Sequence, residues 1–141
     1  MPKLTLSQAN KIIEVAFAKA RKLKIKPLAV AVLDDAGHVK SLQREDGASM
    51  FRNDVAIGKA WASVGMGTSS RTLHGRAKEN PQFFGALAAT AQGKFLPQTG
   101  AVLIKDKDGS ILGAAGASGG TGEEDEAMCI AGIEAAGLVS G

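Results

Sequence analysis

Hydrophobic residues recur at three- and four-residue spacing along the first part of the chain, from Leu6 to Leu23. This spacing places them on one face of an amphipathic helix. Thr5 or Ser7 can cap the start of the helix, and Pro27 prevents it from continuing. The chain therefore opens with a helix that needs a partner surface for its apolar face.

The same helical spacing returns in three later segments and at the C-terminal end. It predicts helices over residues 50–64, from Ser69 or Ser70 through Ala77, and from Asn80-Pro81 to about Ala89. The last helix is expected to start near Thr121, because Thr121 and Glu124 have the spacing of a capping box.

Short β-branched runs bounded by tight turns predict the strands. They lie at residues 28–34, 38–43, 101–104 and 111–117, with residues 93–97 as a connector or an edge strand. Asp35-Ala-Gly37 and Asp106-Lys-Asp-Gly109 join neighbouring runs as hairpins. Hairpins form antiparallel sheets, so the order of elements predicts one α+β domain over residues 1–141, with about five strands flanked by helices.

Composition narrows the class of protein. With 45% hydrophobic and 22% charged residues, the chain resembles an ordinary globular protein. It has no signal-peptide pattern, no apolar run of membrane-spanning length, and a single cysteine, Cys129, so it cannot form an internal disulfide. The net charge is +3, but the basic residues near the N-terminus follow the solvated side of a helix without interleaved aromatics. We expect a cytoplasmic protein that binds neither nucleic acid nor membrane.

The segment from Gly113 to Glu126 is rich in glycine and ends in four consecutive acids. No lysine follows the glycines as in a P-loop, and the acids would repel a phosphate at the helix N-terminus. Two interpretations remain open: a tight strand-to-helix turn with an acidic first turn, or the wall of a site for a neutral or cationic group. In the second, Gly119 and Gly120 would let the backbone approach a ligand closely.

Two further patterns have a functional and a structural interpretation each. Glu123 and Glu126 lie at i, i+3 and are candidate metal ligands, or else form a solvated first turn. His74 is a candidate haem-iron ligand, or else a surface histidine, whereas His38 follows a turn and is expected to be exposed.

Charged residues also gather between the second predicted strand and the helix that follows it. Arg44 and Lys59 are candidates for binding a carboxylate, since a guanidinium offers two parallel donors and an ammonium offers a point charge. The alternative is an ion-pair network of these cations with Asp46 and Asp54.

Taken in order, several of these segments resemble the GlcG/HbpS-like haem-binding family, which includes the C-terminal domain of PduO-type proteins. The resemblance rests on Leu4-Thr-Leu-Ser-Gln-Ala9, Val32-Leu-Asp-Asp-Ala-Gly-His38, Arg44-Glu-Asp-Gly-Ala48, Asp54 through Lys59-Ala60, and Gly116-Ala-Ser-Gly-Gly-Thr121 with Asp125-Glu126. It covers essentially the whole chain. It implies a profilin-like fold, assembly into dimers or larger rings, and haem binding or haem-linked redox sensing in some members.

Three functions follow as hypotheses. The first is a homo-oligomeric small-molecule-binding protein with haem as the first candidate ligand and no other cofactor. Its pocket would be formed by Arg44, Lys59, Gly119 and Gly120, and His74 would be the candidate ligand of the haem iron. The second is an enzyme of glycolate, diol or aromatic catabolism that acts on a small oxygenated acid, with Asp54 or Glu126 as general base. The third is a structural or partner-binding module without catalysis.

Overall fold

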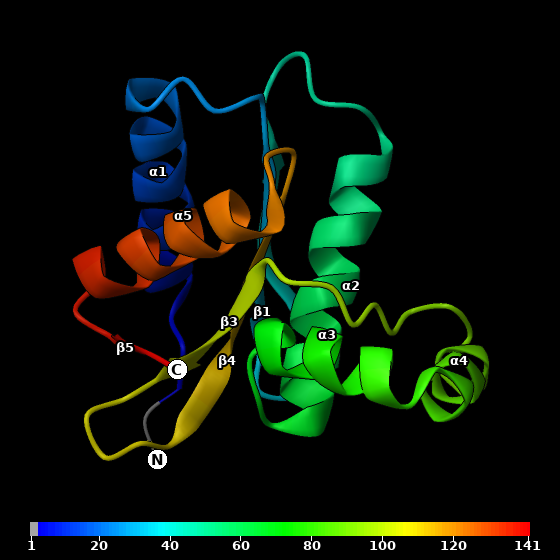
Figure 1. Ribbon diagram of the computed structural model, residues 1–141. Helices are drawn as coiled ribbons and strands as arrows, with labels where there is room; N and C mark the ends of the chain where they lie inside the picture. Colours follow the sequence, from blue (N-terminus) through cyan, green and yellow to red (C-terminus); the bar gives the residue numbers. More distant parts are fainter. Residues whose placement is uncertain (1–2) are drawn as a thin grey trace.

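A five-stranded antiparallel sheet forms the centre of the molecule (Figure 1). The computed structural model describes residues 3–141. The strands are β1 (Ala29–Asp34), β2 (Val39–Arg44), β3 (Ala101–Lys105), β4 (Ile111–Ser118) and β5 (Val139–Ser140), and they lie in the order β2-β1-β4-β3-β5. Both predicted hairpins, β1–β2 and β3–β4, are confirmed. The two hairpins are joined where β1 pairs with β4.

Helices α1 (Leu6–Lys22) and α5 (Gly122–Ala135) pack against each other on one face of the sheet, with α5 crossing α1 (Figure 1). Val30 and Val32 of β1 point into the core between these helices and the sheet. Gly132 sets the distance between the two helices, because a Cβ at this position would overlap the carbonyl oxygen of Ile12. The expected partner surface for the apolar face of α1 is therefore α5 together with β1.

Helix α2 (Phe51–Met66) covers the opposite face, and α3 (Ser70–Glu79) and α4 (Pro81–Thr90) extend outward from it (Figure 1). The strands present mostly small residues on this side, together with Leu33 and Leu103. A Cβ at Gly116 would overlap the carbonyl oxygen of Ala56, so α2 lies nearly against the backbone of β4. This close approach brings the polar side chains of α2 to the end of the sheet.

The predicted elements lie within a few residues of the observed ones. Capping boxes at Thr5 and Thr121 start α1 and α5. Residues 93–97 form a connector, and β5 is a strand that the sequence pattern did not predict. Among residues 3–141, none of the helices has the length and apolar character needed to cross a bilayer.

Candidate functional site

A polar cavity of about 310 Å³ lies where α2, α3 and the start of α5 meet the end of the sheet. Helix α2 contributes Arg52, Val55 and Lys59, which share one helical face because they are three and four residues apart. The residues that complete the lining are His74, Gln98, Thr99, Ser118, Gly120, Gly122, Glu123 and Asp125. The cavity thus lies between α2 and the glycine-rich connection from β4 to α5.

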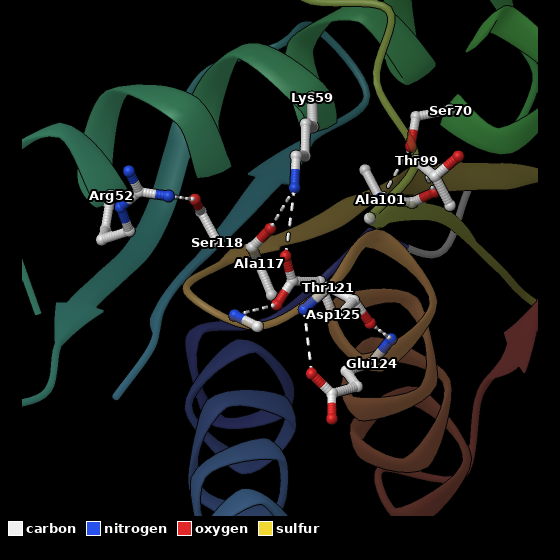
Figure 2. Close-up of polar contacts among 12 residues, drawn as sticks. Arg52, Lys59, Ser70, Thr99, Ala101, Ala117, Ser118, Thr121, Glu124 and Asp125 are labelled. Carbon is white, nitrogen blue, oxygen red and sulfur yellow. Dashed lines mark hydrogen bonds and ion pairs between the residues drawn. The ribbon is translucent and has the colours of Figure 1, made fainter. Parts of the chain in front are cut away.

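A buried ion pair forms the floor of this cavity (Figure 2). Lys59 Nζ lies 3.2 Å from Asp125 Oδ2 and donates to the Ala117 carbonyl oxygen at 3.0 Å. Asp125 Oδ1 accepts from the Gly120 amide at 3.0 Å. The two side chains are only 7% and 2% exposed. The pair connects α2, the end of β4 and the first turn of α5, and so fixes the shape of the cavity.

The position of Asp125 is unusual for an acid. It lies on the buried face of α5, in register with Met128, Cys129 and Ile133. Burial raises the pKa of Asp125 above its usual range, although the Lys59 ammonium and the Gly120 amide act in the opposite direction. The Lys59 ammonium and the Gly120 amide therefore stabilise the ionised form of Asp125 against the effect of burial.

Arg52 is the cation of the cavity that has no acidic partner. It is half-buried, and its Nη1 donates to Ser118 Oγ at 3.0 Å (Figure 2). Its Nε donates to Ser49 Oγ at 3.4 Å. Within residues 3–141, no carboxylate oxygen lies within ion-pairing distance of its guanidinium. The remaining donors on Nη1 and Nη2 are therefore available to an anion.

His74 of α3 lies on the other side of the cavity and is half-buried. Its Nδ1 lies 3.3 Å from the hydroxyl of Thr99, which is itself buried. When Nδ1 carries the proton and donates to this hydroxyl, Nε2 keeps its lone pair. The imidazole is then oriented as a ligand or a base.

A second cavity, of about 470 Å³, shares Val55 with the first. Its walls include the large apolar side chains of Phe51, Ile57, Trp61 and Leu96. An apolar cavity therefore adjoins the polar one along α2.

The structure brings only some of the predicted binding residues together. Lys59, Gly120, His74 and Glu123 line the polar cavity. Arg44 does not: it is exposed at the end of β2, donates to the Ala48 carbonyl oxygen, and lines a separate cavity beside Phe17 and Arg21. Gly119 likewise faces a different cavity, next to Lys24 and Lys26. The ion-pair partner of Lys59 is Asp125, in place of the expected Asp46 or Asp54.

The four consecutive acids have four different environments. Glu124 closes the capping box with Thr121, and Asp125 is buried against Lys59. Glu126 pairs with Arg71 through three side-chain hydrogen bonds, at 2.9, 3.0 and 3.2 Å. Glu123 is exposed at the rim of the polar cavity. Neither of the two earlier interpretations of this run describes all four residues.

The catalytic and metal hypotheses gain no geometric support. Asp54 is exposed and faces the apolar cavity, whereas Glu126 is held by Arg71, so neither candidate base lines the cavity that contains Lys59. Across residues 3–141, no group of three or more His, Cys, Asp or Glu side chains is arranged to hold a metal ion. Glu123 and Glu126 therefore lack a third protein ligand.

Several residues of the cavity lining were not selected from the sequence, among them Arg52, Ser118 and Asp125. A signal existed for Arg52 and for Asp125. Arg52 is on the same helical face as Lys59, and Asp125 interrupts the apolar stripe of the last helix. Ser118 gave no signal, because only the pairing of β4 brings its hydroxyl next to Arg52.

The fold and these cavities define a compact α+β protein whose polar cavity lies at the end of an antiparallel sheet. The chain belongs to the HbpS-like family: the family model described as "Haem degrading protein HbpS-like" matches residues 4–134.

Similar proteins agree with this assignment. A 15.0 kDa protein from the dhaT-dhaS intergenic region of Citrobacter freundii is 26% identical, over 89% of this chain and 86% of its own length. Corrinoid adenosyltransferase PduO of the same organism is 26% identical over 86% of this chain, which spans only 36% of PduO. The crystal structure of a PduOC:heme complex superposes with a TM-score of 0.86, at 26% identity and 97% coverage of both chains.

Proposed function

We propose that this protein binds haem in the two adjoining cavities along α2. The observation that carries the proposal is their complementarity: an apolar cavity with Phe51 and Trp61 shares Val55 with a polar cavity that contains an uncompensated guanidinium and an oriented imidazole. Haem has an apolar macrocycle, two carboxylates and an iron atom that takes axial nitrogen ligands. The family description and the haem complex of PduOC support the same ligand.

The chain's residues fit this group in three ways. Phe51, Trp61 and Leu96 offer apolar contact to the macrocycle. Arg52 offers donors to a propionate, and His74, with its Nδ1 at Thr99, offers Nε2 to iron. A metal-bound histidine usually donates its other N–H to an acceptor, which is the arrangement that Thr99 provides. Bound haem would supply a redox-active iron centre.

Titration with hemin tests the proposal, with the Soret band as readout. We expect saturable binding with a shifted band, and a loss of about tenfold or more in affinity in His74→Ala. His38→Ala is the matched control, because His38 is exposed at the β1–β2 turn and should leave the titration unchanged. If the wild-type protein gives no saturable shift, haem binding is rejected. Equal losses of affinity in both variants would reject the role of His74 but not haem binding itself.

Self-association is the second part of the proposal. Met50 and Phe51, at the start of α2, are 72% and 60% exposed next to the apolar cavity. Large apolar side chains gathered at one place commonly mark a contact surface. We propose that this surface contacts a second copy of the chain. Light scattering after size-exclusion chromatography should give a mass above 14.4 kDa for the wild type, and a smaller mass for Phe51→Ser.

A further inference from the structure

The polar cavity has features of a carboxylate site that do not depend on iron. Its most informative member is Arg52, a half-buried guanidinium whose side-chain partners are hydroxyl groups. Removing an arginine from bulk water without an acidic partner is unfavourable unless another anion compensates it. A ligand carboxylate would supply that anion and accept two parallel hydrogen bonds from the guanidinium.

The surrounding residues are arranged to leave Arg52 uncompensated. Asp125 is a buried acid of the cavity floor, and its oxygens accept from Lys59 Nζ and from the Gly120 amide. Both carboxylate oxygens of Asp125 thus have partners other than Arg52. Figure 2 shows Arg52 and Thr99 on opposite sides of Lys59, with the Ser118 hydroxyl directed at Arg52. The ion pair and the free guanidinium are therefore separate parts of one site.

Charge and size narrow the ligand class. The buried pair of Lys59 and Asp125 is neutral overall, which leaves one positive charge on Arg52. Glu123 at the rim would repel a ligand with a second negative charge. A volume of about 310 Å³ is at the lower end of the usual range for ligand cavities, roughly 300–1,000 Å³.

We propose that this cavity binds a carboxylate with a single negative charge, and that Arg52 is its anchoring residue. Ser118 holds the guanidinium in place, and the third N–H of the Lys59 ammonium is available to the second carboxylate oxygen. His74 and Thr99 lie at the opposite end, where they can bond a hydroxyl or carbonyl group of the ligand. A free small acid presents the same group to Arg52 as a haem propionate does. The site can therefore bind such an acid without haem, and in this respect it goes beyond the proposed haem function.

Titration with propionate, followed by amide chemical shifts in a ¹H–¹⁵N spectrum, tests the site directly. We expect saturable shifts at Ser118, Gly120 and Thr99, weaker binding of the dianion malonate, and no binding of the uncharged propionamide. Arg52→Gln should weaken propionate binding roughly tenfold or more, the usual effect of losing a charge-assisted hydrogen bond. Arg52→Lys should retain part of the affinity, and it provides a second variant in case Arg52→Gln does not fold.

The matched control is Arg44→Gln, which removes the exposed arginine of the separate cavity and should leave propionate binding unchanged. Equal binding of propionamide, or an equal loss in the Arg44 and Arg52 variants, would overturn the proposal. A comparison of hemin with hemin dimethyl ester separates the two sources of the carboxylate. If Arg52 anchors a haem propionate, Arg52→Gln weakens the binding of hemin but not the binding of the dimethyl ester. If propionate binds and hemin does not, the proposed site for free carboxylic acids is supported and the haem proposal is rejected.

Discussion

Lys59 and Asp125 are 66 residues apart in sequence, yet their charged groups meet 3.2 Å apart with almost no access to water. A buried pair of this kind is held by all of its hydrogen bonds together, because each charge alone would be strongly disfavoured in the interior. The absence of a side chain at Gly100 leaves room for the ammonium group, since a Cβ there would lie 2.5 Å from Lys59 Nζ. The geometry of the cavity floor thus depends on three separate segments.

Removing one partner of this pair should destabilise the fold strongly. Asp125→Ala leaves the Lys59 ammonium buried without its counter-charge, so we expect a loss of about 3–5 kcal/mol in the free energy of unfolding. Urea denaturation measures it. Glu126→Gln is the matched control one residue along α5, where the pair with the half-exposed Arg71 should contribute far less. The double variant Lys59→Met with Asp125→Leu should lose less than Asp125→Ala. A larger loss in the double variant would contradict this account.

The same carboxyl group should make stability depend on pH. Its folded-state pKa is raised, chiefly by burial, above the value of 3.8 expected for the unfolded chain. The folded state therefore holds the proton to higher pH than the unfolded state does. The resulting stabilisation is complete below pH 3.8 and is lost as pH rises through the folded-state pKa.

This dependence can be isolated with Asp125→Asn. The free energy of unfolding of the wild type, minus that of the variant, should fall as pH rises from about 3.8 toward neutrality. Urea denaturation at several pH values gives both quantities. A difference that increases with pH would show instead that the Lys59 ammonium dominates and lowers the pKa of Asp125.

The close contact of α1 and α5 should not tolerate a methyl group. In Gly132→Ala the new Cβ would overlap the Ile12 carbonyl oxygen, and a backbone atom cannot turn aside as a side chain can. We expect a loss of about 1–3 kcal/mol in the free energy of unfolding, despite the better helix propensity of alanine. Gly75→Ala in α3 is the control, because no heavy atom lies within 4 Å of its Cβ. It should raise stability by about 0.5–1 kcal/mol, and equal effects of the two variants would contradict the packing argument.

The single cysteine should be inert in the folded protein. Cys129 is completely buried on α5, its thiol lies 3.7 Å from the Gly100 carbonyl oxygen, and burial raises the pKa of the thiol. Alkylation requires the thiolate and access to it. We expect iodoacetamide to label Cys129 only as urea unfolds the chain, with mass spectrometry as the readout. Rapid labelling of the native protein would contradict the burial of this face of α5.

The sequence predicted the elements better than their arrangement. Local spacing and turn residues were enough for the helices and for both hairpins, because these are set by neighbours in the chain. The pairing of β1 with β4 joins segments with more than half of the chain between them, and no local pattern encodes it. The two-residue strand β5 was missed for a related reason, since it is defined only by its pairing with β3.

The candidate site shows the same division. Lys59, Gly120 and His74 were selected from their residue types and do line one cavity. Arg44 was selected as part of the charged cluster between the second predicted strand and the next helix, and Arg52 was not considered. The direction of each side chain decides which cavity it reaches. Arg52 shares the α2 face of Lys59, and Arg44 is on an edge strand whose loop turns toward α1. Helical register was the physical signal that separates the two arginines.

The pairing of β1 with β4, and of α1 with α5, also determines when the molecule can fold. During synthesis β1 leaves the ribosome long before β4 exists, and the apolar face of α1 has only β1 and β2 to cover it until α5 follows. Contacts between such distant segments slow folding because a large loop must close before they form. The N-terminal half therefore emerges with an apolar helix that is only partly covered and with an unpaired strand edge, a state that favours association with chaperones.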